Sequence, residues 1–600
     1  MVSPCGRYVI AYNGEIYNFR DIKIELLSSS NQQPGFNHPP FASYDSPHFS
    51  GHSDTEVLLA SIRAWGLNET LMRINGMFAF ALWDREARTL SLVRDRLGKK
   101  PLYLGWAGKN FVFGSELKAL RAHPEFANPV NRQALTLLLR HNCIPAPHSI
   151  YERVYKLPPA TALTIPLAKV GQTIGFEDIA SRLKPFWSAK QVCESGQRDP
   201  FGGDLKEIDE QLEGLLKDAV SSRMIADVPL GAFLSGGIDS SLVVALMQAQ
   251  SSRPVKTFSV GFREAGHNEA DDARRVAQFL DTDHHELTLS PQDALDVVPH
   301  LPNLYDEPFS DSSQIPTYLV SKFTREHVTV ALSGDGGDEL FGGYNRYVWG
   351  PELWDRMSAW PPFIRSGSAA VLDAVPPKTW PGIMRLVRLN HRTPADKAQK
   401  VAQVLRAANP ADLYKSLVSH WHQPENIVID GHEPETTLKD AGEVIEQFGF
   451  AEGMMLLDQE TYLPDDILVK VDRASMGVNL EVRAPLLDYR LVEFAAKLPL
   501  DLKIKDRQGK YLLRQILYRH VPRGLIERPK MGFEMPIADW LRGPLRDWAE
   551  TLLNEGRLRQ EGFFRPEPIR QKWQQHLDGR RNWQFHLWDI LMFQAWLDEQ

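Results

Sequence analysis

This sequence contains little cysteine, no excess of basic charge and no long apolar runs. Its 600 residues include three cysteines, Cys5, Cys143 and Cys193, which are widely spaced. This spacing suits neither a disulfide framework nor a cysteine-based metal site, and it fits a reducing compartment. The formal net charge of −8 gives no reason to expect a nucleic acid or an anionic membrane as partner.

No stretch is long and apolar enough to cross a bilayer, and the first residues lack the apolar core of a signal peptide. We therefore expect a cytoplasmic protein. Its length exceeds a single hydrophobic core, which indicates at least two domains. A Walker A loop, G-x-x-x-x-G-K-[ST], does not occur in the sequence, which excludes the most common phosphate-binding loop.

A turn rich in serine and glycine carries the strongest functional signal. Ala232-Phe-Leu-Ser-Gly-Gly-Ile-Asp-Ser-Ser241 has the pattern of a short strand, a tight turn and the start of a helix. Glycines let a backbone approach a ligand closely, and free amides in a turn and at a helix N-terminus attract anions. The hydroxyls add donors, and Asp239 adds a carboxylate of the kind that binds magnesium. This pattern predicts a polyphosphate with its metal, and an ordinary strand–turn–helix corner is the alternative.

The first part of the chain is predicted to be mostly strand. Strand patterns occur in residues 1–125 at Arg7–Tyr12, Met77–Trp83, Thr89–Arg94 and Asn110–Gly114. The pair Asn13-Gly14 is typical of a turn, and residues 54–65 have helical spacing. Residues 126–205, with several prolines and glycines, are expected to connect this part to the next.

From residue 206 onward, strands alternate with helices. Strand patterns at 232–234, 257–262, 284–289 and 328–332 are separated by helical stretches. Such alternation indicates a parallel sheet with helices on both faces, and ligands bind at the carboxyl ends of its strands. Residues 350–600 are expected to be mainly helical.

Three further runs place charged residues in unusual surroundings. Leu332–Tyr344 follows a strand with glycines and acids, for which a turn around a structural cation is the alternative. Tyr462–Asp488 carries charges within an apolar stretch, where burial is costly unless they pair, so an interior salt-bridge network is the alternative there. Arg528–Phe533 holds a lysine between proline and glycine.

In this order, the four runs resemble the synthetase domain of glutamine-hydrolysing asparagine synthetases. Segments of the N-terminal part resemble the glutaminase domain of the same family, which is a class II glutamine amidotransferase. These segments are Tyr12–Asn18, Ser53–Glu56, Gly76–Trp83, Arg94–Tyr103 and Ser115–Lys118. The resemblance covers nearly the whole chain and implies an α/β protein. It implies an Ntn-type α+β sandwich over 1–125, a connector over 126–205, and a parallel-sheet synthetase domain over 206–600. The last has a PP-loop ATP site of the adenine-nucleotide α-hydrolase type and a helical C-terminal part.

The resemblance also implies a reaction. One domain hydrolyses glutamine to ammonia, and the other activates the aspartate side chain with ATP as aspartyl-AMP, releasing pyrophosphate before ammonia displaces AMP. ATP and Mg²⁺ are the implied cofactors, the partners are small-molecule substrates, and a homodimer is compatible with the family. The alternatives are amidation of another carboxylate, such as a sugar acid in surface-polysaccharide synthesis, a β-lactam synthetase-like cyclase, and a non-catalytic binding protein.

Position by position, the resemblance assigns roles to individual residues. ATP and pyrophosphate binding is assigned to Leu234, Ser235, Gly236, Gly237, Asp239, Ser240, Ser241, Val260, Ser333 and Gly334. Magnesium binding is assigned to Asp239 and Asp338. Catalytic roles are assigned to Asp335, Lys530, Glu481 and Arg483. Glutamine binding is assigned to Asn13, Gly14, Glu15 and Asp54.

The start of the sequence departs from the family pattern. Glutaminases of this family use an N-terminal cysteine, exposed by removal of methionine, as nucleophile. This sequence begins Met1-Val2 instead, and Cys5 falls where the family has an internal strand pair. We therefore expect an N-terminally truncated glutaminase domain that lacks its nucleophile. Either the start codon is misassigned and the true protein is longer, which we favour, or the chain is real and uses free ammonia. For the sequence as written we expect free ammonia rather than glutamine as the nitrogen source.

Overall fold

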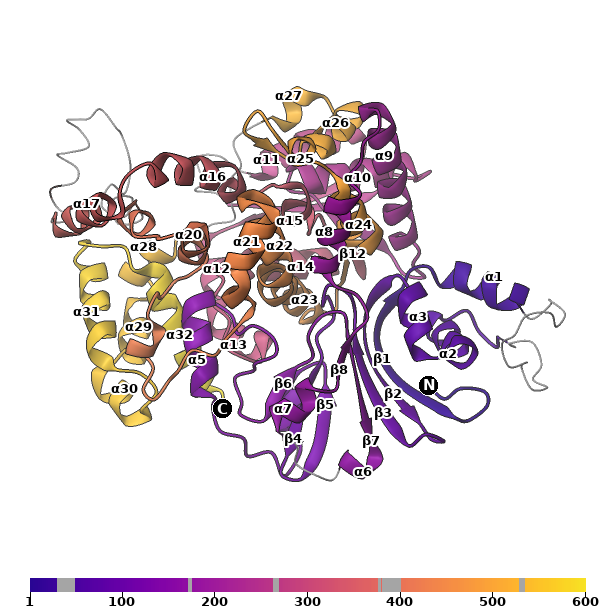
Figure 1. The fold of residues 1–600 in the computed structure, drawn as a ribbon, viewed down its shortest axis with the longest axis horizontal. Coiled ribbons are helices and arrows are strands. Elements are labelled where there is room, and N and C mark those ends of the chain that lie inside the picture. Colours follow the sequence, from indigo (N-terminus) through magenta and orange to yellow (C-terminus); the bar gives the residue numbers. More distant parts are fainter. Residues whose placement is uncertain (30–48, 171–174, 263–268, 376–378, 380–400, 528–534) are drawn as a thin grey trace.

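The computed structural model describes the chain except for residues 30–48, 171–174, 263–268, 376–378, 380–400 and 528–534. Two antiparallel sheets form the N-terminal part, and an α/β region with a parallel sheet lies beside them (Figure 1). Helices from the end of the sequence, including α31 (Pro566–Leu577) and α32 (Gln584–Asp598), make up a third block, whereas α26 (Tyr511–His520) packs against α10 (Ile238–Ala249) of the α/β region. The α/β fold class expected from the sequence is confirmed.

The N-terminal part is a sandwich of two antiparallel sheets. The larger sheet has the order β1–β2–β3–β7–β8, with the strands Tyr8–Ile16, Gly76–Asp84, Thr89–Arg94, Thr161–Pro166 and Leu183–Pro185. The smaller sheet has the order β5–β4–β6, with the strands Asn110–Gly114, Tyr103–Ala107 and Val154–Lys156.

Strand β2 shows why the sandwich forms. Alternate residues of a strand face opposite sides of the sheet. Phe78 and Phe80 pack with the helices α1 (Phe19–Ser29) and α2 (Asp54–Trp65), whereas Ala79 and Ala81 belong to the apolar cluster between the two sheets. The strand is therefore buried on both faces, large side chains on one and small ones on the other.

The expected turn at Asn13-Gly14 is wrong. Both residues lie inside the continuous strand β1, where Gly14 pairs with Phe78 of β2. Gly14 has a φ of 149°, and a Cβ at this position would lie 2.1 Å from the carbonyl oxygen of Met77. The glycine is required by this close approach of two strands and not by a reversal of the chain.

The structure also differs from the domain boundary expected at residue 125. Strand β7 pairs with β3, and β6 pairs with β4, so strands from the expected connector belong to both N-terminal sheets. Helix α8 (Ala189–Arg198) then packs against α24 (Tyr489–Lys497) of the C-terminal region. The segment 126–205 is thus divided between the two parts of the molecule.

The parallel sheet has the order β11–β10–β9–β12–β13. Its strands in chain order are β9 to β13, at Leu230–Phe233, Lys256–Phe262, Asp283–Leu289, Val330–Leu332 and Glu481–Arg483. All neighbouring pairs are parallel, as the sequence pattern predicted. The helices between and before these strands include α9, α10, α11 and α14, at Leu205–Arg223, Ile238–Ala249, Glu269–Leu280 and Gln314–Arg325.

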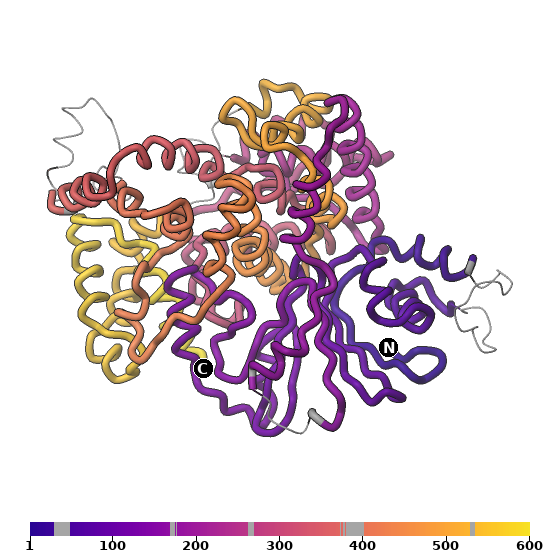
Figure 2. Tube along the Cα trace, viewed as in Figure 1, coloured from indigo at the N-terminus to yellow at the C-terminus, as the bar shows by residue number. Residues whose placement is uncertain are grey.

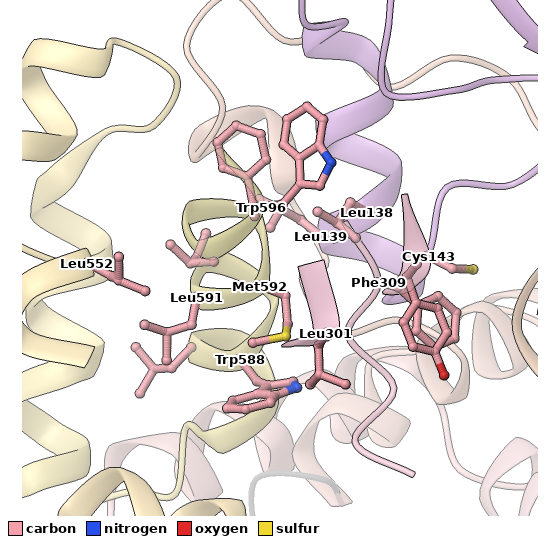
Figure 3. Packing of buried hydrophobic residues seen from close by; sticks show 14 of the residues in the cluster. Leu138, Leu139, Cys143, Leu301, Phe309, Leu552, Trp588, Leu591, Met592 and Trp596 are labelled. Atoms are coloured by element: carbon pink, nitrogen blue, oxygen red, sulfur yellow. The ribbon is translucent and has the colours of Figure 1, made fainter. Parts of the chain in front are cut away.

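The second half of the chain is mainly helical, as expected. Its longer described helices include α16, α17, α22, α23, α26, α31 and α32, at Asn345–Ser358, Pro362–Ala374, Phe450–Glu460, Leu468–Met476, Tyr511–His520, Pro566–Leu577 and Gln584–Asp598. Helix α32 presents Trp588, Met592 and Trp596 to a buried cluster that also contains Leu138 and Leu301 (Figure 3). The C-terminus consequently lies beside α5 (Arg132–His141), next to the N-terminal part (Figure 2).

Candidate active site

Three segments far apart in the sequence meet at the carboxyl edge of the parallel sheet. The turn 234–241 follows β9, the turn 333–338 follows β12, and Arg483 ends β13. Glu481 begins β13, where it pairs with Val330, the first residue of β12. The two turns are in close contact, because a Cβ on Gly334 would lie 2.8 Å from the backbone nitrogen of Ser240. The sheet therefore gathers most of the residues that the resemblance assigned to the ATP site, at the edge where such sheets bind ligands.

Hydrogen bonds within the first turn hold its shape. The hydroxyls of Ser235 and Ser240 lie 3.0 Å apart, and the Ser235 hydroxyl accepts the N–H of Gly237 at 3.2 Å. Gly237 precedes α10, and no side chain among the described residues caps that helix. The first amides of a twelve-residue helix are thus left for a ligand, which is the arrangement that favours an anion.

Some assigned residues have their side chains in the protein interior. Leu234 and Val260 belong to buried apolar clusters, so only their backbones are available to a nucleotide. Ser241 is fully buried, and its hydroxyl has no hydrogen-bond partner among the described residues. Lys530 lies outside the described residues.

A lysine that the sequence reasoning missed joins the two predicted magnesium ligands. The Lys510 amine lies 2.8 Å from a carboxylate oxygen of Asp338 and also pairs with Asp239. Burial opposes the charge of this amine, but the two carboxylates outweigh it and hold the pKa of Lys510 above its usual range. In the sequence, Lys510 directly precedes the apolar spacing of α26. This local pattern does not indicate that its side chain meets two acids.

The two carboxylates fit a nucleotide-bound magnesium ion. Asp239 and Asp338 converge closely enough to share one ammonium group. One or two carboxylates, completed by phosphate oxygens and water, are the usual donors for Mg²⁺ at nucleotide sites. No cluster of three or more histidine, cysteine or acidic side chains with metal-binding geometry occurs in the described part of the chain, so phosphate oxygens would have to complete the coordination.

Asp335 lies in the same turn, among buried basic groups. Its carboxylate accepts a hydrogen bond from the Ser333 hydroxyl at 2.7 Å. Nearby, Lys470 donates to Asp311 at 2.7 Å; burial lowers the pKa of Lys470, but Asp311 and, more weakly, Asp335 raise it to a net value above normal. The turn thus combines an acid with fixed positive charge, as a site for joining two anions requires.

The predicted catalytic arginine connects the two parts of the molecule. Arg483 donates to Glu481 at 2.6 Å and to the carbonyl oxygens of Arg223 and Ile225 at 3.0 and 2.6 Å. Its guanidinium also pairs at 3.4 Å with Glu15, a residue assigned to glutamine binding. Burial raises the pKa of Glu15 to about 7, although Arg483 opposes the shift. The two predicted sites are therefore joined by one ion pair.

The remaining residues assigned to glutamine lie together along β1. Asn13 donates its side-chain amide to the Ser115 hydroxyl at 3.1 Å. The Asp54 carboxylate, at the start of α2, accepts from the Tyr12 hydroxyl at 2.7 Å and from the backbone N–H of Ile16 at 2.9 Å. Asp54 is thus fixed against the strand that carries Asn13.

The run 462–488 also contains the interior ion pairs considered as its alternative explanation. Lys100 donates to Asp472 at 2.9 Å, and Arg473 pairs with Glu116 at 3.1 Å. These pairs hold α23 against the N-terminal part. Interior ion pairs and residues with predicted catalytic roles therefore occur side by side in this run.

Comparisons with known proteins agree with this architecture. A family model described as asparagine synthase matches residues 211–598, and one described as glutamine amidotransferase domain matches residues 1–174. The second match begins at residue 1, so it does not support the expected N-terminal truncation. Among the described residues, no helix has both the length and the apolar character that a membrane span needs.

Curated relatives from distant organisms align along most of the sequence. Asparagine synthetase [glutamine-hydrolyzing] 1 of Bacillus subtilis is 30% identical over 605 residues, which cover 98% of this chain and 85% of that protein. Asparagine synthetase [glutamine-hydrolyzing] 3 of the same organism is 28% identical, covering 91% of this chain and 79% of that protein. The Gallus gallus enzyme named asparagine synthetase [glutamine-hydrolyzing] is 25% identical, covering 96% and 83%. The chain accordingly belongs to the asparagine synthase family of ligases, with a glutamine amidotransferase domain at its N-terminal end.

Proposed function

We propose that this protein converts aspartate to asparagine through an aspartyl-AMP intermediate and releases AMP and pyrophosphate. The observation that carries the proposal is the convergence of Asp239, Asp338 and Asp335 with the serine–glycine turn at one edge of the parallel sheet. Membership of the asparagine synthase family supports ATP-dependent amidation as the general reaction type of this protein. The geometry supports the adenylate route, because the free amides before α10 and the carboxylates of Asp239 and Asp338 could bind a polyphosphate without a Walker lysine.

In the first step, an oxygen of the substrate side-chain carboxylate attacks the α-phosphorus of ATP. A new O–P bond forms, the bond between the α-phosphorus and the bridging oxygen breaks, and pyrophosphate leaves. The amides of the turn and the hydroxyls of Ser235 and Ser240 bind the departing phosphates. Asp239 and Asp338 would hold Mg²⁺, which would offset phosphate charge. Lys530 is proposed to act at the α-phosphate, and Gly236, Ser333 and Gly334 are proposed to contact the nucleotide through their backbones.

In the second step, ammonia attacks the activated carbonyl carbon. A C–N bond forms, the C–O bond to AMP breaks, and one proton leaves the nitrogen. Asp335 is proposed to orient the acyl-adenylate. Glu481 and Arg483 are proposed to fix the position of the N-terminal domain relative to the acyl-adenylate. Asn13, Gly14 and Asp54 are proposed to bind glutamine. The use of ammonia instead of glutamine stays a prediction, which a direct comparison of the two nitrogen sources tests.

The decisive experiment is substrate-dependent exchange of labelled pyrophosphate into ATP, followed by identification of the nucleotide product. We expect exchange with aspartate and formation of AMP. Asp239→Ala, Asp338→Ala and Lys530→Ala should each abolish the exchange. A panel of other carboxylates, including sugar acids, accompanies aspartate. Exchange with another acid only, or ADP and orthophosphate as products, would contradict the proposal.

A further inference from the structure

A loop of the N-terminal domain, held by its own hydrogen bonds, buries a lysine beside residues of the synthetase domain. In the loop 94–100, the Asp95 carboxylate accepts the backbone N–H groups of Leu97, Lys99 and Lys100 at 2.9 to 3.1 Å. The Arg94 guanidinium donates to the carbonyl oxygens of Gly98 and Lys100 at 2.8 and 2.9 Å. A loop fixed from both sides holds its side chains in defined directions.

The Lys99 side chain is buried without a partner. It is 8% exposed, and its amine has neither a hydrogen-bond acceptor nor an ion-pair partner in the described part of the chain. This is unusual, because a buried ammonium without a partner is costly. The adjacent Lys100 shows the ordinary solution, an ion pair with Asp472 at 2.9 Å.

The charged groups around the amine come from both domains. Burial lowers the pKa of Lys99 to about 8, and Asp335 is the group that opposes this shift most strongly. The other charged groups acting on it, in decreasing order, are Lys100 of its own loop, Arg223 at the end of α9, and Asp472 of α23. Asp335 of the synthetase domain therefore acts on the amine electrostatically, although the backbone of Lys99 belongs to the other domain.

Lys99 also borders a small cavity between the domains. The cavity has a volume of about 20 Å³ and is lined by Met77 of β2, by Ala484 directly after β13, and by Arg223. This volume holds one molecule of the size of water. Ammonia has nearly the same size as water. Met77 pairs with Glu15 of β1, so the cavity lies between the strand assigned to glutamine and the strand that carries Arg483.

We propose that Lys99 is the proton acceptor of the amide-forming step, supplied to the synthetase site by the N-terminal domain. This inference rests on the proposed function. When the C–N bond forms and the C–O bond to AMP breaks, the neutral amine takes the proton that the nitrogen loses. The resulting ammonium is stabilised by the carboxylate of Asp335, and its proton passes to solvent before the next turnover. An amine without a hydrogen-bond partner has its lone pair available for this transfer.

The test separates the two half-reactions in the full chain, with ammonium chloride as nitrogen source. Lys99→Met and Lys99→Arg are compared with wild type; arginine keeps the positive charge but does not release its proton. We expect acid-dependent pyrophosphate exchange within about twofold of wild type for both variants. Amide formation should fall about 10²- to 10⁴-fold in both, as for loss of a general base. Lys109→Met, which alters an exposed lysine of the same domain, is the matched control and should change neither activity.

A second measurement needs no variant. At a fixed concentration of neutral ammonia, the wild-type rate of amide formation should rise with pH to a plateau, with an apparent pKa near 8. Full amide formation by Lys99→Arg, equal loss of both half-reactions in Lys99→Met, or a flat pH profile would each overturn the inference. If no acid supports exchange in wild type, the proposed function fails as well. If Lys99→Met and Lys99→Arg retain both pyrophosphate exchange and normal amide formation, the role of Lys99 is overturned and the proposed function stands.

Discussion

Two buried lysines are each acted on by an acid of the turn 333–338, Lys99 by Asp335 and Lys510 by Asp338, and they differ in one respect. Lys510 shares its ammonium between Asp239 and Asp338, whereas Lys99 has no hydrogen-bonding partner among the described residues. The pKa of Lys510 is raised by its carboxylates, and the pKa of Lys99 is lowered to about 8 by burial. A paired amine is a fixed charge, and an unpaired one changes its charge near neutral pH. The same residue type can therefore hold anions at one position and move protons at another.

Of the two lysines, the paired one should have the larger effect on pyrophosphate exchange when it is removed. Lys510→Met removes a buried ammonium that pairs with Asp239 and Asp338, so the turn loses a fixed positive charge beside the triphosphate that it is proposed to bind. We expect acid-dependent pyrophosphate exchange to fall roughly 10²- to 10³-fold, as when one stabilising donor is lost. Radiolabel exchange measures this directly, with Lys109→Met as control.

The same variant also tests the assignment of the magnesium ligands. In wild type the Lys510 ammonium occupies both carboxylates, so it competes with a metal ion for them. Added Mg²⁺ should therefore raise the melting temperature of Lys510→Met more than that of wild type. If calorimetry shows that Mg²⁺ raises the melting temperatures of Lys510→Met and wild type equally, Asp239 and Asp338 do not bind the metal ion.

Removing the unpaired amine should stabilise the protein. The folded pKa of Lys99, about 8, lies below its ordinary value of 10.5. Between these two pH values the unfolded chain binds more protons than the folded one, so wild-type stability rises with pH. Lys99→Met should be more stable than wild type by about 1–3 kcal/mol below pH 8, and this advantage should disappear towards pH 10.5. Urea unfolding at pH 7 and pH 10 measures the difference, and a variant less stable than wild type at pH 7 would contradict the account.

The smallest effect concerns the ion pair between the domains. Glu15→Gln removes the charge that faces Arg483 at 3.4 Å, and the pair is partly exposed. A pair of this kind contributes up to about 1 kcal/mol, so exchange should fall by less than about fivefold. Because the pKa of Glu15 is raised to about 7, wild type loses this charge as the pH falls below 7, and the two proteins should then converge. Exchange rates at pH 6 and pH 8 test this, and a constant ratio would exclude the pair as the cause.

The arrangement of the synthetase sheet could be predicted because its signals are local. The alternation of strands and helices from residue 206 onward predicted the parallel sheet, and α10, α11 and α14 lie where helical stretches were expected between the strands. The turn 234–241 could be interpreted because its glycines, serines and acid are adjacent in the sequence. The resemblance gave roles to Ser333 and Gly334, which follow β12, and to Arg483, which ends β13. The pairing of these two strands places the three residues at the carboxyl edge of the sheet.

What the sequence could not provide depends on contacts between distant segments. Asn13-Gly14 has the composition of a turn, and only its approach to Met77 makes it part of a strand. Whether Lys99 or Lys510 is paired depends on acids hundreds of residues away, so their different roles leave no local pattern. The same holds for β7, whose partner β3 lies across a long stretch of chain.

The position of β13 has a consequence for the synthesis of this protein on the ribosome. β12 and β13 are neighbours in the sheet, yet residues 333–480 are translated between them. Until residue 483 has left the exit tunnel, β12 with its buried residues Val330 and Leu332 is an open sheet edge in the nascent chain. Open apolar edges pair readily with other chains, so a polypeptide released before that point is prone to aggregate. The last strand that completes the catalytic edge is therefore also the one that protects the sheet.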